Sequence, residues 1–412
     1  MGWPDSVIWW HCYPLGFLGA ERSAIDAVEH RLPRLENWLD YVLELGANGL
    51  LLAPVFASRT HGYDTVDHFR IDPRLGDEED FAKLVQAARG RGIRVLLDGV
   101  FNHLSQDHEL VRAAVQGGRG SEAGAWIRWV EDYPRGFEGN LDLVELNLEH
   151  PPVQDYVVDV MTHWLHKGVD GWRLDAAYAA GPDAWRPIVD RVRAAYPECW
   201  ILAEVIHGDY VGFVARSGVD SVTEYELWKA VWSSLNDTNL HELAWTLSRH
   251  AEFSAAFRPL TFVGNHDTSR IATRLDDPRN LPLATALLML LPGVPSIYAG
   301  DEQGFTGEKT DGPTGDDAVR PPFPEHPSGL AGFGRGTFEL HQRLISVRRN
   351  HPWLTSADVS VREVTNETVA IDLAGPADRL TLGLNLSDAP VELPGPDGPL
   401  RVDAHGWAIS GD

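Results

Sequence analysis

Short apolar runs alternate along the chain with segments in which apolar residues recur at helical spacing. The short runs are typical of buried strands, because each is bounded by Gly, Pro or a charged residue. We expect strands at 7–13, 49–55, 93–100, 171–175, 200–204, 221–227, 260–267 and 295–299. Helical spacing is clear in the segments between them, for example from Val153 to Trp164. Strands that alternate with helices predict an α/β fold with a parallel sheet.

The alternation lapses twice. Residues 102–152, after the third expected strand, are rich in Gly, Trp and charge, and a long insertion of this kind is usually functional. After the eighth expected strand come a Gly/Pro-rich loop, 304–335, and a last helix near 337–350. From about residue 352, short Val/Thr/Leu runs separated by turn residues predict antiparallel strands at 359–364, 368–373 and 380–386.

These patterns predict a (β/α)8 barrel with a short insertion after strand 3 and a small C-terminal antiparallel β domain. The expected boundaries are 1–351 for the barrel, about 103–150 for the inserted subdomain and 352–412 for the β domain. A doubly wound α/β sheet would also explain the alternation, but the sequence has no glycine-rich phosphate loop to support it.

Four of the expected strands end in a carboxylate: Asp98, Asp175, Glu204 and Asp267. In a barrel the C-terminal ends of the strands meet on one face, where such enzymes do their chemistry. Retaining cleavage of a glycosidic bond needs one ionised carboxylate as nucleophile and one protonated carboxyl as acid. The pattern therefore indicates glycosidase chemistry, although any one of these groups alone could instead cap a helix or form a surface ion pair.

Neighbouring residues suggest different roles for these groups. Arg173 lies two residues before Asp175, so both side chains point to the same side of the strand, and the guanidinium favours an ionised nucleophile. Glu204 follows an apolar run with no adjacent cation, which predicts a raised pKa and the role of acid. Asp267 stands beside His266, a pair suited to binding sugar hydroxyls as charge develops.

Six segments resemble the ordered signature segments of the α-amylase family of glycoside hydrolases. They are Asp98–His103, Asp142–Asn147, Gly171–Ala176, the strand ending at Glu204, Phe262–Asp267 and Gly293–Glu302. Together they span most of the expected barrel. The resemblance is nearest to neopullulanase and cyclomaltodextrinase relatives, without the N-terminal β domain that those enzymes usually carry.

The resemblance implies roles for individual residues. Asp175 would be the nucleophile, Glu204 the acid/base and Asp267 the stabiliser of the transition state. Substrate would be bound by Tyr63, Asp98, His103, Arg173 and His266. The implied activity is retaining hydrolysis of α-glucosidic bonds in malto-oligosaccharides or related short α-glucans. A transglycosylase or glucosyl isomerase would use the same machinery and stays open as the alternative.

The chain departs from the family pattern after the nucleophile. Tyr178 and Ala179 stand where the family often has Lys or His, so we expect the Tyr178 ring to face the leaving-group sugar. Asn102 matches a common calcium position, but one Asn without a His partner is too little for a site with six or more oxygens. No cofactor and no metal site is therefore predicted. The aromatic residues of the insertion, Trp126, Trp129, Tyr133 and Phe137, could line a cleft or fill a small core.

Charge and composition limit the classes of partner that the protein could bind. The net charge of -25 argues against nucleic acid and anionic membranes as partners. The only two cysteines, Cys12 and Cys199, fall in different expected strands, and no signal peptide or membrane span is visible, which favours a cytoplasmic location. A non-catalytic barrel is disfavoured because the three carboxylates with implied catalytic roles, Asp175, Glu204 and Asp267, are all present. Linkage, chain-length preference, endo or exo attack and oligomeric state stay open.

Overall fold

Eight parallel strands form the central sheet of the computed structural model, which describes residues 2–312 and 314–410. They are β1 (Trp9–Cys12), β2 (Gly49–Leu52), β5 (Arg94–Gly99), β11 (Gly171–Leu174), β12 (Trp200–Ala203), β13 (Ser221–Val222), β14 (Leu260–Thr261) and β15 (Val294–Tyr298). Their order in the sheet is β13-β12-β11-β5-β2-β1-β15-β14. A parallel bridge between Thr223 and Leu260 joins the two outer strands, so the sheet closes into the expected barrel.

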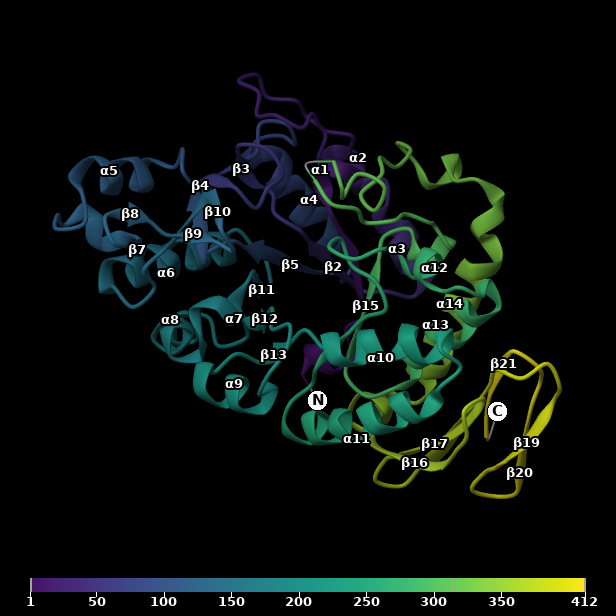
Figure 1. The fold of residues 1–412 in the computed structure, drawn as a ribbon. Coiled ribbons are helices and arrows are strands. Elements are labelled where there is room, and N and C mark those ends of the chain that lie inside the picture. Colours follow the sequence, from purple (N-terminus) through teal and green to yellow (C-terminus); the bar gives the residue numbers. More distant parts are fainter. Residues whose placement is uncertain (1, 313, 411–412) are drawn as a thin grey trace.

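Helices surround the strands (Figure 1). The longer ones are α3 (Leu39–Leu45), α4 (Glu78–Gly90), α6 (Pro151–His166), α8 (Pro182–Ala195), α9 (Tyr210–Ser217), α10 (Tyr225–Asn236), α11 (Leu240–Ala256), α13 (Leu281–Leu290) and α14 (Arg335–Asn350). Helix α5 (Glu109–Gly117) lies in the insertion, and helices of four residues are α1 (Pro14–Phe17), α2 (Pro33–Glu36), α7 (Ala177–Ala180) and α12 (Ile271–Arg274). No helix in 2–312 or 314–410 combines the length and the apolar composition needed to cross a bilayer.

The sixth and seventh strands are shorter than the sequence predicted. The run at 221–227 is a strand only to Val222, and helix α10 begins at Tyr225. The reason lies in the spacing of the buried residues Leu227, Ala230, Val231 and Leu235, which follows a helix rather than a strand. The seventh strand ends at Thr261, and residues 262–267 continue as loop up to the carboxylate.

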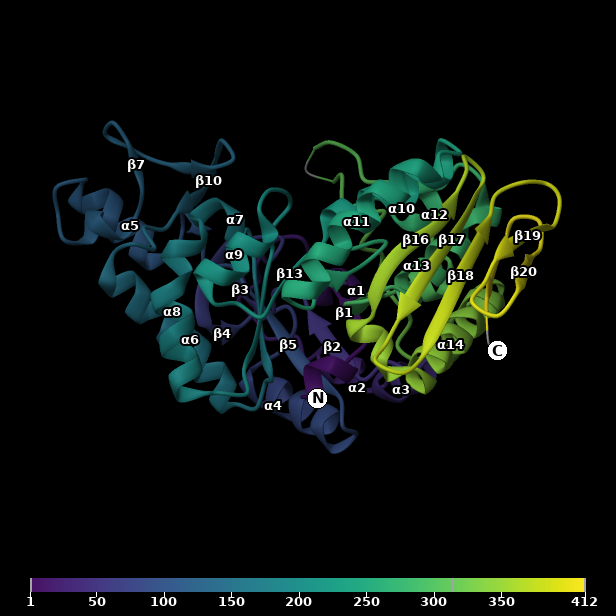
Figure 2. The same ribbon diagram turned by 90° about the horizontal axis from the view of Figure 1, so that it is seen from below.

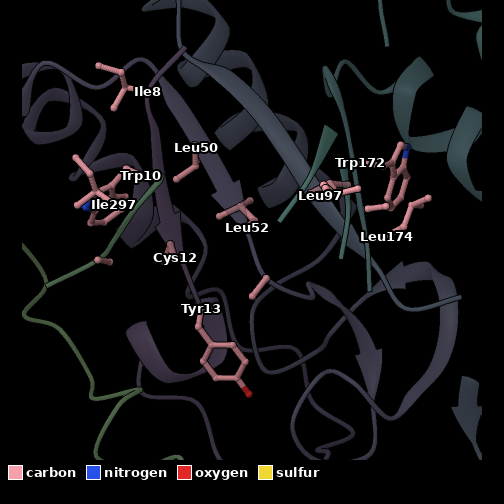
Figure 3. Packing of buried hydrophobic residues seen from close by; sticks show 14 of the residues in the cluster. Ile8, Trp10, Cys12, Tyr13, Leu50, Leu52, Leu97, Trp172, Leu174 and Ile297 are labelled. Carbon is pink, nitrogen blue, oxygen red and sulfur yellow. The ribbon is translucent and has the colours of Figure 1, made fainter. Parts of the chain in front are cut away.

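Alternate residues of each strand fill two different cores. Trp9, Leu51, Leu96, Leu202 and Val294 pack inside the barrel with other apolar side chains. The intervening residues point outward to the helices. Figure 3 shows part of this outer core, with Ile8, Trp10, Leu50, Leu52, Leu97 and Ile297 labelled.

Two segments of the polypeptide extend the mouth of the barrel. After β2, the hairpin of β3 (Phe56–Ser58) and β4 (Thr65–Ile71) carries Tyr63 in its turn. After β5, the insertion forms a small sheet of β6 (His103–Ser105), β9 (Gly136–Phe137) and β10 (Asn140–Glu145), with α5 and the two-residue pair β7 (Trp129–Val130) and β8 (Tyr133–Pro134). Tyr133 is 74% exposed, so it fills no core, whereas Trp126, Trp129 and Phe137 are half-buried.

The C-terminal strands form a separate antiparallel sheet. Its order is β16 (Asp358–Val364), β17 (Thr368–Ala374), β18 (Arg379–Asn385) and β21 (Gly406–Ile409). A hairpin of β19 (Val391–Pro394) and β20 (Pro399–Val402) lies beside it. The sheet packs against α11 of the barrel through β16 (Figure 2).

Arg348, near the end of α14, ties this helix to the turn between α13 and β15. It is only 4% exposed and donates hydrogen bonds to the carbonyl oxygens of Met289 and Leu291, both at 2.8 Å, and of Gly293. Because Arg348→Leu leaves three buried carbonyl groups without a donor, we expect it to lower the free energy of unfolding by about 3 kcal/mol. Urea unfolding followed by tryptophan fluorescence measures this change.

Arg335→Leu on the same helix is the matched control. Its side chain is 82% exposed and pairs with Glu339 one turn away, so the loss should stay below about 0.5 kcal/mol. Equal losses for the two variants would contradict the role given to Arg348.

Candidate active site

One guanidinium lies at the centre of the carboxylates at the barrel mouth. Arg173, on β11, places Nη1 at 2.6 Å from Asp98 Oδ2 and at 3.2 Å from Asp175 Oδ1. Its Nη2 lies 2.7 Å from Glu204 Oε1. The three carboxylates come from the ends of β5, β11 and β12, which are neighbours in the sheet. Parallel pairing therefore brings three of the four sequence-predicted carboxylates onto one buried cation.

The sequence prediction that Glu204 has no adjacent cation is wrong, because the Arg173 guanidinium contacts its carboxylate. Besides Arg173, Glu204 accepts hydrogen bonds from the Ala176 backbone N–H at 2.9 Å and from the Tyr225 hydroxyl at 3.1 Å. The cation was missed because it comes from the neighbouring strand, where Arg173 pairs with Leu202, two residues before Glu204. Cross-strand neighbours of this kind are not visible in the run of residues before Glu204.

Asp175 is an unusual carboxyl group. Burial and the nearby Glu204 raise its pKa well above the ordinary range of Asp, although Arg173 lowers it as the sequence predicted. Burial likewise raises the pKa of Asp98 against the opposing effect of Arg173. Asp175 and Glu204 contact the same guanidinium, and the charge of Glu204 is the largest electrostatic contribution to the raised pKa of Asp175.

Asp267 lies in the opposite electrostatic environment. Burial acts to raise its pKa, but His266 and Arg320 outweigh this and hold the pKa well below the ordinary range. His266 Nε2 lies 3.0 Å from Asp267 Oδ2, and Arg320 Nη2 donates to Asp267 Oδ1 at 2.8 Å. The site thus combines a carboxyl group with a lowered pKa, Asp267, and one with a raised pKa, Asp175.

Arg320 was missed by the sequence analysis. It lies in the loop 304–335 after β15, donates from Nε to the carbonyl oxygen of His266 at 2.9 Å and stands over the Tyr13 ring at 4.5 Å. The only signal in the sequence was that this Gly/Pro-rich loop follows a strand whose end lies at the mouth. Nothing distinguishes Arg320 from the other charged residues of the loop.

Tyr63 and His103, two of the residues expected to bind substrate, lie in the same cluster. The Tyr63 hydroxyl donates to Asp98 Oδ2 at 3.0 Å and is hydrogen-bonded to His266 Nε2, and the Tyr63 and His266 rings are parallel. His103 Nε2 donates to the Tyr63 carbonyl oxygen at 3.1 Å, and its ring stacks on Phe137 of the insertion. Burial lowers the pKa of His103 to about 4, so its ring is neutral near pH 7.

Tyr178, on α7, connects the barrel to the insertion. Its hydroxyl donates to Glu138 Oε1 at 2.6 Å, and its backbone N–H donates to the Glu204 carbonyl oxygen at 3.1 Å. On the other side of Glu204, Asn265 Nδ2 donates to the Tyr225 hydroxyl at 3.0 Å. Glu138, Tyr225 and Asn265 were not among the predicted site residues. Glu138 and Tyr225 lie outside the runs that end in a carboxylate, and Asn265 lies within such a run but is uncharged.

One group in the described part of the chain has the spacing of a metal site, and it lies outside this cluster. His30, Asp77 and Asp80 bring their ligand atoms within 4.8 Å of one another. Asp77 and Asp80 form a capping box at the start of α4, and His30 Nδ1 lies 2.5 Å from Asp80 Oδ2. Helix capping thus explains this arrangement.

Comparison with known proteins matches residues 32–141 and 131–343 to the family model described as alpha amylase, catalytic domain. A cyclomaltodextrinase of Geobacillus thermopakistaniensis (strain MAS1) is 31% identical over 96% of this chain and 66% of its own length. Neopullulanase 2 of Thermoactinomyces vulgaris is 30% identical over 85% of this chain and 63% of its own. The chain thus spans about two thirds of the length of these relatives.

Among solved structures, the ligand-free cyclic α-maltosyl-(1→6)-maltose hydrolase of Arthrobacter globiformis is similar over almost the whole chain. The TM-score is 0.86 at 26% identity, with 99% of each chain covered. The barrel, the insertion and the C-terminal β sheet therefore have counterparts in a protein of nearly the same extent.

Arg173→Met tests whether this guanidinium neutralises the buried carboxylates. Carboxyl groups with a raised pKa stabilise the folded state while protonated, below the ordinary Asp value of 3.8, and this contribution is lost as pH rises through the raised pKa. Removing Arg173 raises these pKa values further, so the loss of stability should grow between about pH 5 and about pH 8, reaching about 3–5 kcal/mol. Unfolding midpoints at both pH values measure it.

Arg186→Met is the control, because it removes an exposed ion pair with Asp190 and should change the free energy of unfolding little at either pH. A loss for Arg173→Met that is the same at both pH values would contradict the proposed neutralisation.

Proposed function

The chain belongs to the α-amylase family of glycoside hydrolases, and on that premise we propose that it is a retaining α-glycosidase acting on malto-oligosaccharides or related short α-glucans. The observation that carries the proposal is the Arg173 guanidinium, which holds Asp175 and Glu204 side by side in a buried mouth. Asp267 lies in the same mouth, fixed by His266 and Arg320. This arrangement supplies the two carboxyl groups that retaining hydrolysis needs.

In the proposed mechanism, Asp175 attacks the anomeric carbon while Glu204 gives its proton to the leaving oxygen. The product of this step is a covalent glucosyl-enzyme, and Glu204 then takes a proton from the water that releases the sugar. The first step needs one proton on the pair. Repulsion between the two neighbouring carboxyl groups favours this singly protonated state, and substrate must bind to the form in which the proton is on Glu204.

Asp267 has a different proposed role. Because its pKa is held well below the ordinary range, it is ionised throughout the reaction and can bind sugar hydroxyls more strongly as positive charge develops. Arg320 and His266 fix its carboxylate, so these bonds need no rearrangement in the transition state. We infer that Arg320 is a positioning residue of the site.

The remaining cluster fits the binding of the sugar before the cleaved bond. Tyr63 would offer its ring face to the sugar, while Asp98, His103, Arg173 and His266 supply donors and acceptors for the hydroxyl groups. Tyr178, beside Glu204, would contact the sugar that leaves. Their mutual hydrogen bonds restrict these side chains before substrate arrives, which lowers the ordering cost of binding.

The substrate class is proposed from the relatives and from the site together. The similar proteins are named for cyclomaltodextrins, pullulan and a cyclic maltosyl-maltose, all of them α-glucans or products of them. We further infer a catalytic unit at 1–351, with its insertion at about 103–150, and a C-terminal β domain at 352–412. A cytoplasmic location is supported by the buried and free state of Cys12 and Cys199.

Asp175→Asn and Glu204→Gln test the proposal. Each should lower kcat on maltotriose or a cyclodextrin by about 1,000-fold or more, because neither amide can act as nucleophile or acid. Proton NMR of the wild-type reaction should show that the released sugar is first formed in the α configuration. Longer oligosaccharides among the products would reveal transfer to a sugar in competition with water.

Asp190→Asn, at an exposed carboxylate on α8, controls for the loss of a charge. The proposal fails if the product is first formed with inverted configuration, or if Asp175→Asn keeps most of the wild-type activity.

The pH dependence tests the coupling of the carboxyl pair. Glu204 is the charge that contributes most to the raised pKa of Asp175, so Glu204→Gln should lower that pKa. α-Maltosyl fluoride needs no acid for departure of its leaving group, so its turnover by Glu204→Gln reports on Asp175 alone. We expect the acidic limb of kcat/KM to lie at lower pH in Glu204→Gln than in the wild type. An unchanged limb, or one at higher pH, would refute the coupling.

A further inference from the structure

A groove with a volume of about 590 Å³ opens on the rim of the mouth, outside the cluster around Arg173. It is formed by the start of α10, the middle of α11 and the segment after β12, which lie together beside β13 (Figure 1). Ile206, Tyr225, Trp228, Trp245 and Arg249 are among its lining residues. Its size is that of a pocket for a small organic ligand.

The groove lies next to the candidate active site, because two of its lining residues are close to Glu204. Tyr225 lines the groove, and its hydroxyl donates to Glu204 Oε1 at 3.1 Å. Ile206 follows Glu204 by two residues. The cluster of Tyr63, His103 and Asp98 lies on the Asp175 side, so the groove approaches the carboxyl group that serves the leaving oxygen. A chain that occupies the mouth therefore has its leaving part directed toward this groove.

Aromatic rings line the groove in a fixed arrangement. Trp245 is 65% exposed and is the only tryptophan among the large exposed apolar side chains of residues 2–312 and 314–410. Trp228 is half-buried, stacks on Phe262 and lies edge-on to Tyr225. A solvent-exposed indole at the edge of a groove offers the apolar face on which the C–H groups of a sugar ring pack.

Charged side chains flank the rings without filling the groove. Arg249 stands 5.7 Å from the Trp245 ring and is held by Glu226 through hydrogen bonds of 2.6 and 2.9 Å. Lys229 and Glu242 form a second pair between α10 and α11. Because each pair is already neutralised, the groove favours a neutral, hydroxyl-rich ligand over an ion, and the paired groups still have donors and acceptors for hydroxyl groups.

We propose that this groove binds the leaving-group part of an α-glucan, with the Trp245 ring under a glucose unit beyond those that flank the cleaved bond. The inference rests on the proposed function and adds a specificity-determining residue to it. Long oligosaccharides reach Trp245, whereas short ones end before it. The groove thus makes the enzyme favour longer substrates.

Trp245→Ala tests the inference. Loss of one stacking contact should lower kcat/KM for maltohexaose by about 3- to 10-fold, mainly through a higher KM, and change kcat/KM for maltotriose by less than about twofold. Trp245→Phe, which keeps an aromatic face, should recover most of the loss. Phe333→Ala removes a 70% exposed aromatic side chain from the loop 304–335 and is the matched control, with no expected change in the ratio of the two substrates.

The outcomes separate this inference from the proposed function. If the wild type cleaves malto-oligosaccharides and Trp245→Ala keeps the wild-type ratio for maltohexaose over maltotriose, the groove has no part in binding. If the wild type cleaves none of them, the proposed function fails. Calorimetric titration with maltohexaose then tests whether the groove binds the sugar. Equal dissociation constants for wild type and Trp245→Ala would overturn the proposed binding. Thermal midpoints establish that each variant is folded.

Discussion

A single buried guanidinium organises the mouth of this barrel. Arg173 contacts carboxylates from three adjacent strands, and each of them would be costly to bury without a cation. One positive charge does not fully stabilise three ionised carboxylates, because burial and the repulsion among them favour the protonated forms. The pKa of Asp98 and that of Asp175 are accordingly raised. In the proposed mechanism, this incomplete neutralisation leaves one proton on the Asp175–Glu204 pair, and substrate binding must place it on Glu204.

The barrel makes that arrangement possible through its closure. Strands β13 and β14 are only two residues long, and a bridge between Thr223 and Leu260 completes the ring. Directly after Thr223, Glu224 is buried against His250 of α11, with Nδ1 at 2.8 Å from both carboxylate oxygens. This contact fixes the corner where α10 begins, and with it the Tyr225 hydroxyl that donates to Glu204. Tyr225, at this corner, also lines the groove that contains Trp245.

Segments outside the barrel complete the site. The loop after β15 supplies Arg320, which fixes Asp267, and the insertion supplies Glu138, which binds Tyr178. Phe137 of the insertion also stacks on His103. The barrel strands thus provide the carboxylates of the candidate active site, and the loops supply side chains that hold the surrounding residues. Loops that are built on a rigid scaffold commonly carry specificity in this way.

The sequence by itself determined the architecture and identified the carboxylates that meet at the mouth of the barrel. Apolar runs ending in Asp98, Asp175, Glu204 and, through a short loop, Asp267 were enough, because parallel strands in a closed barrel bring their C-terminal ends to one face. The sixth strand was overestimated because a short apolar run fits strand and helix alike, and the seventh because its run continues as loop after Thr261. Only the tertiary structure decided that Arg173 also reaches Glu204, that Arg320 holds Asp267, and that burial outweighs Arg173 at Asp175. These contacts depend on cross-strand register and on how distant loops fold over the mouth, and neither is encoded in the local order of residues.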